Sequence, residues 1–176
     1  MSRIFKCLLA LLLTCGAPAV SQPSSNSLNL RQLTRAAGYI FAGRVLSVSS
    51  ARTQTGGDSP MIRITFQVEQ GLHGVRTGAR LTIREWVGAW GMGERYRVGE
   101  RWLLFLYRPS KAGLTSAVAG ARGRFLLDQQ GRVVLGRARA LLLNDRLAQA
   151  TRYRDRVRLR DFSRAIRVAR EQESLP

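Results

Sequence analysis

The stretch Val98-Gly99-Glu100-Arg101-Trp102-Leu103-Leu104-Phe105-Leu106-Tyr107-Arg108 decides the fold that we expect for this chain. Its six consecutive apolar or aromatic residues, Trp102 to Tyr107, lie between a glycine turn and Pro109. Such a run is too short for a typical helix and bulky enough for a strand that is buried on both faces. With half-buried strands before and after it, the run predicts a small closed β-sheet at the centre of the protein.

The clearest alternation of apolar and polar residues runs from Met61 to Val68, so we expect a strand with one face on the core and one in water. Gly43 is expected to bend the first strand, and Asp128 to Gly131 to form a hairpin turn. The remaining strands are expected at Tyr39–Val48, Leu81–Arg84, Leu114–Val118, Arg124–Leu127 and Arg132–Leu135.

Two helices are expected outside this sheet. A short one, capped by Ser27 and ended by Gly38, shares the apolar residues Leu30, Leu33 and Ala37 on one face. The last begins at Asp161 as N-cap and carries an apolar stripe of Phe162, Ala165, Ile166 and Ala169. A further helix over Ala138–Ala150 would present Leu141, Leu142 and Leu147.

The first nineteen residues are typical of a secretory signal peptide. Arg3 and Lys6 precede an apolar run that is too short to span a bilayer, and Ala17-Pro18-Ala19 supplies the small residues of a cleavage site. Residues 20–27 then form a flexible tether, and the mature protein is expected to be secreted or periplasmic, with no transmembrane segment. The alternative is a membrane-anchored lipoprotein acylated at Cys15.

The chain is strongly basic, with 29 Lys+Arg against 11 Asp+Glu and a formal net charge of +18 over 176 residues. All the cations except Lys6 and Lys111 are arginine. This excess fits recognition of phosphate or carboxylate by the planar guanidinium group, and it equally fits the codon bias of a GC-rich genome. Its 45% hydrophobic content is sufficient for one globular domain with a core. After cleavage the mature chain lacks cysteine, so that core would act without disulfides.

Several strings, taken in order, resemble the bacterial secreted domains related to the tissue inhibitors of metalloproteinases, the netrin-like group. They are Ile40–Val45, Phe66–Gly74, Val98–Leu106 and Gly120–Phe125. The resemblance covers Leu28–Leu135 and implies an OB-like closed β-barrel over residues 28–136, followed by a basic C-terminal extension, 137–176, with the final helix. It also implies that Glu100 serves a turn. The animal inhibitors chelate the protease zinc through an amino-terminal cysteine, and the mature chain has none, so this mechanism does not carry over.

The residue inventory does not favour an enzyme. His73 is the only histidine and has no cysteine partner in the mature chain, so we expect no metal site and no cofactor. His73 is also the only imidazole available to a nucleophilic serine, so a catalytic triad would arise only by accident of folding. Nothing in the spacing of Glu69, Glu85, Glu94 and Glu100 favours a glycosidase pair.

Two basic segments are candidate binding sites. In the loop Trp86–Arg97, aromatic and basic residues interleave as in OB-type ligand sites: Arg84, Trp86, Trp90, Arg95, Tyr96 and Arg97. The alternative is that these aromatics plug the end of the barrel while the arginines are solvated. In the second segment, period-two spacing would put five guanidinium groups on one face of an extended chain: Arg152, Arg154, Arg156, Arg158 and Arg160. That face would meet a phosphate-rich surface, or protect an exposed edge by charge.

The sequence therefore predicts a mainly β protein whose function is that of an exported, non-catalytic binding or interaction module. Its partner would be a protein or a polyanion of the cell envelope. The first alternative is a protease-inhibitor-like domain that uses an edge different from that of the animal proteins. The second is non-specific polyanion binding.

Overall fold

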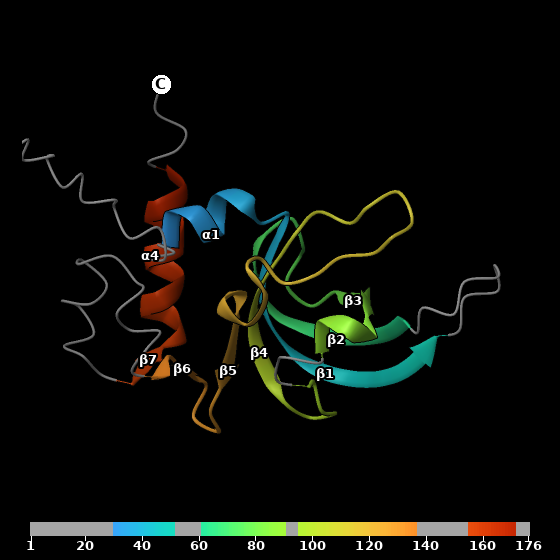
Figure 1. Ribbon diagram of the computed structural model, residues 1–176. Coiled ribbons are helices and arrows are strands. Elements are labelled where there is room, and N and C mark those ends of the chain that lie inside the picture. Colours follow the sequence, from blue (N-terminus) through green and yellow to red (C-terminus); the bar gives the residue numbers. More distant parts are fainter. Residues whose placement is uncertain (1–29, 52–60, 91–94, 137–154, 172–176) are drawn as a thin grey trace, which may run out of the picture.

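The computed structural model describes residues 30–51, 61–90, 95–136 and 155–171, and within them it forms one antiparallel sheet with two helices (Figure 1). The strand order is β3-β2-β1-β4-β5-β6-β7. The strands are β1 (Tyr39–Ala51), β2 (Met61–His73), β3 (Arg80–Trp86), β4 (Arg101–Leu106), β5 (Arg124–Leu127), β6 (Arg132–Val134) and β7 (Arg156–Arg158). The helices are α1 (Leu30–Ala36) and α4 (Leu159–Glu171), with two 3-10 turns, η1 (Val87–Trp90) and η2 (Gly120–Gly123).

The predicted central strand is confirmed as β4, which is paired on one side with β1 and on the other with β5. Every residue from Trp102 to Leu106 is buried. The strand is buried on both faces because it lies between two separate apolar cores. Trp102, Leu104 and Leu106 belong to the first core, and Leu103 and Phe105 belong to the second. Tyr107, expected at the end of this strand, lies outside it and is exposed.

The first core fills the concave side of the strongly curved β1–β4 portion of the sheet. A chain of edge-to-face aromatic contacts crosses it, with ring centroids 5.5 Å apart for Phe41–Phe66, 5.5 Å for Phe66–Tyr96 and 5.4 Å for Tyr96–Trp102. These arrangements suit the charge distribution of aromatic rings and add to the burial of their area. Tyr96, which precedes β4 in the chain, is therefore one of the members of this core.

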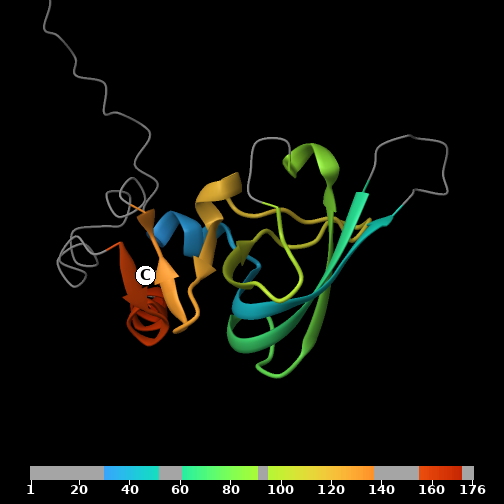
Figure 2. The same cartoon turned by 90° about the horizontal axis from the view of Figure 1, so that it is seen from below.

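The second core lies between the other face of β4 and the two helices. Phe105 contacts Phe125 at 5.9 Å between centroids, and Phe125 contacts Phe162 of α4 at 5.3 Å. The predicted stripe is confirmed, since Phe162, Ile166 and Ala169 are buried and Ala165 packs against them. Figures 1 and 2 show α1 and α4 together at one end of the molecule, with the long strands β1 and β2 reaching away from them.

The described strands do not close into a barrel, since β3 and β7 are the outer strands of the sheet. Leu114–Val118, expected as a strand, forms only two isolated bridges, Leu114 to Arg84 of β3 and Ala117 to Leu106 of β4. The segment makes one hydrogen bond to β3, from Thr115 N to Arg84 O at 2.9 Å, before it turns to β4. It therefore spans the opening between β3 and β4 without a continuous ladder on either side.

The expected bend at Gly43 and the expected hairpin turn at Asp128–Gly131 are both confirmed. The β1–β2 register shifts between Ala42 and Gly43, and a Cβ on Gly43 would lie 2.7 Å from the Gln67 carbonyl oxygen, so the bend requires glycine. The Asp128–Gly131 hairpin is closed by the Gly131 N–H, which donates to the Asp128 carbonyl at 2.9 Å. The pairing of β5 with β6 follows from this turn.

Helix α1 carries its buried Leu30 and Leu33 as predicted, whereas α4 begins at Leu159, two residues before the expected cap. The Asp161 carboxylate lies in the first turn of α4, where it accepts a hydrogen bond from Arg158 Nε at 2.7 Å. The carboxylate is therefore engaged by the last residue of β7. None of the described helices is long and apolar enough to cross a membrane.

Several expectations fall on residues that the structure does not describe: the signal peptide, the tether with Ser27, and the helix over Ala138–Ala150. Within the C-terminal part that is described, β7 pairs with β6 and α4 belongs to the second core. This end of the chain is thus part of the same sheet and core as residues 30–136.

Candidate functional site

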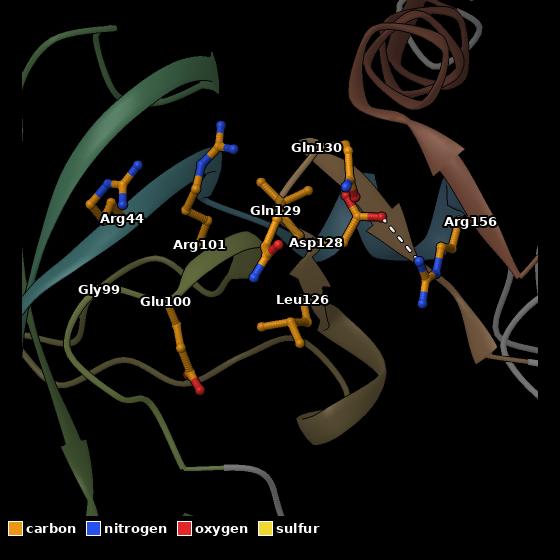
Figure 3. A pocket seen from close by; sticks show the side chains of 10 residues that line it. Arg44, Gly99, Glu100, Arg101, Leu126, Asp128, Gln129, Gln130 and Arg156 are labelled. Carbon is orange, nitrogen blue, oxygen red and sulfur yellow. Dashed lines mark ion pairs between the residues drawn. The ribbon is translucent and has the colours of Figure 1, made fainter.

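A polar cavity of about 690 Å³ lies where the first residues of β4 meet β1, the β5–β6 turn and β7 (Figure 3). In Figure 3, Arg44 and Arg101 lie on one side of the cavity and Arg156 on the other, with the turn between them. The lining residues are Arg44, Gly99, Glu100, Arg101, Leu126, Leu127, Asp128, Gln129, Gln130 and Arg156.

The arginine pair on one side of the cavity is set by strand register. Arg44 of β1 and Arg101 of β4 are directly opposite each other in the β1–β4 ladder. Like charges at such positions repel, and Glu69 of β2 compensates them. Its Oε2 lies 2.6 Å from Arg101 Nη2, and its Oε1 lies 3.5 Å from Arg44 Nε. Arg101 is therefore held firmly, while Arg44 makes a longer contact and its side chain is 50% exposed.

The opposite side of the cavity is organised by Asp128. Its Oδ1 accepts a hydrogen bond from the Arg132 backbone N–H at 2.8 Å, and its Oδ2 accepts one from Arg132 Nε at 2.8 Å. Arg156 Nη1 lies 3.5 Å from the same Oδ2, and its side chain is 54% exposed. Desolvation acts to raise the pKa of Asp128, but the two hydrogen bonds from Arg132 and the charges of Arg132 and Arg156 hold it below its usual value.

The two turns that border the cavity are fixed by local hydrogen bonds. Gly131 has a φ of 71°, which suits glycine, and a Cβ there would lie 3.3 Å from Arg101 Nη1. Glu100 Oε2 accepts from the Arg97 N–H at 3.0 Å and from Trp102 Nε1 at 3.1 Å. These bonds agree with the turn role that the resemblance implies for Glu100.

The cavity as a whole favours an anionic guest. Its two carboxylates, on Glu100 and Asp128, already accept hydrogen bonds from the protein. In contrast, Arg44 and Arg156 reach their carboxylate partners only at 3.5 Å and are half exposed. Guanidinium groups in this situation have N–H donors available to a ligand carboxylate or phosphate.

The residues predicted for the Trp86–Arg97 loop are dispersed, and none of the five whose side chains are described lines the cavity. Trp86, at the end of β3, is 45% exposed, and Arg95 and Arg97 are exposed. Arg84 Nη2 donates to the Ala112 carbonyl at 2.6 Å. Trp90 ends η1, and its side chain is not among those described.

Tyr96 lies inside the first core and is only 3% exposed, so its ring is not a surface for stacking a ligand. The Arg124 guanidinium carbon lies 4.9 Å from the centre of the Tyr96 ring, and Arg124 Nη2 is 3.1 Å from Glu85 Oε2. Burial raises the pKa of the Tyr96 hydroxyl, and the charge of Glu85 acts in the same direction. For this residue the structure agrees with the alternative in which aromatics fill the end of the sheet.

The predicted ladder of five arginines is not one extended face. Arg156 and Arg158 are exposed on either side of buried Val157 in β7, but the strand ends there and Arg160 already belongs to α4. Helical geometry at Leu159 breaks the period-two spacing. Arg152 and Arg154 lie outside the described residues. Of the five, Arg156 lines the cavity.

The glutamates considered as a catalytic pair have partners within the protein wherever the structure describes them. Glu69 pairs with Arg101, Glu85 with Arg124, and Glu100 holds a turn, while Glu94 is not described. Burial lowers the pKa of His73, and the charges of Arg170 and Arg108 lower it further. Among the residues that the structure describes, no three of His, Cys, Asp or Glu gather as metal ligands would.

Compared with known proteins, the chain matches no protein-family model, no curated protein and no solved structure.

Proposed function

We propose that this chain is an exported, non-catalytic binding module and that its ligand presents an anionic group to the cavity. The observation that carries the proposal is the convergence of Arg44, Arg101 and Arg156, from three different strands, on one cavity of about 690 Å³. The strands place the backbones of the three arginines around the cavity before any ligand arrives, and Glu69 also holds the side chain of Arg101, which reduces the entropy lost on binding.

The three arginines would have different parts in binding. Arg101 is anchored by Glu69 at 2.6 Å and serves as the fixed charge of the site. Arg44 and Arg156 would exchange their 3.5 Å contacts for shorter, charge-assisted hydrogen bonds to the ligand. Gln129 and Gln130 add neutral donors and acceptors at the rim, suited to the polar remainder of the ligand.

We propose further that the sheet is an OB-like barrel of the netrin-related type, closed by the irregular segment Leu114–Val118. Two bridges support this idea: Leu114 meets β3 in parallel fashion, and Ala117 meets β4 in antiparallel fashion. Export is supported by the signal-like composition of residues 1–19.

Titration with inorganic phosphate and with citrate at low ionic strength tests the cavity proposal. Arg44→Gln and Arg156→Gln should each weaken binding of the better anion about tenfold or more, since a charge-assisted hydrogen bond contributes about 1.5–3 kcal/mol. Arg164→Gln, which removes an exposed charge from α4, is the matched control and should leave the affinity unchanged. Equal losses in all three variants, or the absence of saturable binding, would refute the site.

A second candidate function is non-specific polyanion binding, favoured by the exposed arginines of β7 and α4. Besides Arg156 these are Arg158, Arg160, Arg164 and Arg167. Within the described part of the chain, Arg156 pairs with Asp128, and Arg158 and Arg160 pair with Asp161. Inhibition of a protease, the other alternative drawn from the sequence, stays a prediction.

A further inference from the structure

The strand β1 continues well beyond its neighbour β4. The β1–β4 ladder ends at Arg44 opposite Arg101, and one more pair of hydrogen bonds joins Val45 to the turn, from Val45 N to Glu100 O at 2.8 Å and from Gly99 N to Val45 O at 2.9 Å. Past that point, Ser47–Ala51 pairs with Met61–Thr65 of β2 on one side only, among the described residues. Figures 1 and 2 show β1 and β2 reaching together past β4 as an arm.

The free edge of this arm has the hydrogen-bonding capacity of a sheet. In an antiparallel strand, alternate residues direct both N–H and C=O to the same side, so the outer side of 46–51 presents backbone donors and acceptors in a regular row. Such an edge can pair with another extended chain. The bulge between Val45 and Ser47 marks where the strand leaves β4.

The two outer strands of the sheet carry charges or are partly covered, whereas none of the residues that the structure describes pairs with the outer side of 46–51. The three-residue β7 carries Arg156 and Arg158, and β3 is met at Arg84 by the Thr115 N–H. Short length, charge and coverage are the usual means by which proteins prevent pairing at an edge. The sequence Leu46-Ser47-Val48-Ser49-Ser50-Ala51 contains neither a charge nor a proline.

We propose that Leu46–Ala51 is a docking strand that receives an extended, acidic segment of a partner protein by β-strand addition. This mode takes its affinity from main-chain hydrogen bonds and its selectivity from alternate side chains. The proposal stands apart from anion binding in the cavity, because it rests on backbone groups of a different part of β1.

The charges around the edge select an acidic partner. Exposed Arg63 of β2 is directly opposite Ser49 in the β1–β2 ladder, so its positive charge lies one strand away from the edge. Exposed Arg97 lies in the turn beside Val45. A second copy of the chain is disfavoured, since an exported form beginning at Val20 would carry a formal charge of +16, that is +18 for the full chain less Arg3 and Lys6.

The test uses a fluorescent hexapeptide of alternating aspartate and valine and two N-methylated forms of it. One form is methylated on the first, third and fifth amides and the other on the second, fourth and sixth, so the two have the same charge and composition. Only the form that loses the donors facing β1 should bind about tenfold or more weakly by fluorescence anisotropy. Residue-resolved amide exchange should show protection of alternate amides within 46–51 when the unmethylated peptide is bound.

Each contrary outcome is informative. The proposal fails if the unmethylated peptide shows no saturable binding up to about 1 mM, if both methylated forms bind alike, or if protection appears outside 46–51. A dimer in sedimentation that protects the same amides would assign the edge to a second copy instead. Arg156→Gln should leave peptide binding intact, so failure at the cavity and failure at the edge are distinguishable.

Discussion

Arg44 and Arg101 face each other across the β1–β4 ladder, so two like charges lie side by side in the wall of the cavity. Glu69 of β2 contacts both, at 3.5 Å and 2.6 Å. This carboxylate makes the pairing tolerable for the fold and at the same time competes with an anionic ligand for the two guanidinium groups. Stability and anion affinity should therefore change in opposite directions when Glu69 is altered.

Glu69→Gln is expected to lower the free energy of unfolding by about 0.5–1 kcal/mol, a modest loss because the pair is partly exposed and screened by solvent. The same variant should bind phosphate or citrate more tightly than the unaltered protein. Urea denaturation at low and high salt measures the first effect, and titration measures the second. Glu171→Gln, an exposed change at the end of α4, should do neither. Weaker anion binding by Glu69→Gln would contradict this account of the cavity.

Phe105→Ala is expected to cost about 3–5 kcal/mol of unfolding free energy, as for other large-to-small changes at fully buried positions. The ring lies in the second core and contacts Phe125 at 5.9 Å. Tyr107→Ala, two residues on and exposed, is the control and should cost much less. Urea denaturation decides between them, and similar losses in both would place the core elsewhere.

The stabilising contribution of Asp128 should disappear in acid. Because its pKa in the folded protein is below the unfolded value, its contribution is present at neutral pH and is lost as pH falls through the folded pKa. The difference in unfolding free energy between the unaltered protein and Asp128→Asn should therefore shrink as pH falls from 7 toward 2. A difference that stays constant over this range would show that the Arg132 hydrogen bonds do not distinguish the two protonation states.

Polyanion binding should be electrostatic and should localise to β7 and α4. On duplex DNA the log–log salt slope is about 0.9 per phosphate neutralised, so glutamine at Arg158, Arg160, Arg164 and Arg167 should flatten it by up to about 3–4. The charge-matched control replaces four exposed arginines elsewhere: Arg63, Arg76, Arg80 and Arg122. Equal flattening in both sets would leave codon bias as the explanation of the arginine excess.

The exported form is expected to begin at Val20, after Ala19, or at Gln22 if cleavage follows Ser21. Such a chain contains no cysteine, so dithiothreitol should leave its melting temperature unchanged. Intact-mass analysis of the exported protein identifies its first residue. A mass showing an acylated Cys15 terminus would establish the lipoprotein alternative.

The positions of β4 and of most neighbouring strands could be predicted from the sequence because a buried strand has a recognisable local pattern of apolar residues. A continuous apolar run needs cover on both faces, and alternation from Met61 to Val68 needs it on one. Leu114–Val118 has a similar apolar pattern, but the segment meets β3 at one residue and β4 at another and forms no ladder with either. Local composition does not reveal how a strand's pairing is divided among its neighbours.

No local pattern in the sequence indicates the position of the cavity. Arg44 and Arg101 meet only through the β1–β4 register, and Arg156 reaches Asp128 only once β7 is placed beyond β6. The Trp86–Arg97 loop had the composition of a binding site, yet Tyr96 is a core residue whose ring packs edge-to-face between Phe66 and Trp102. Composition alone therefore did not locate the cavity, because its arginines come together only in the folded chain.

The two-sided burial of β4 has a consequence for the fidelity of folding. In most strands a one-residue slip is penalised because it would turn polar side chains inward, but between Trp102 and Leu106 both faces are apolar and that penalty is absent. A polar contact at the start of the strand can set the alignment instead, because Arg101 Nε donates to Glu69 Oε2 of β2 at 2.7 Å. Arg101 lines the cavity and also helps to fix the register of the central strand. A substitution there that changes the ligand preference would therefore also disturb the pairing of the sheet.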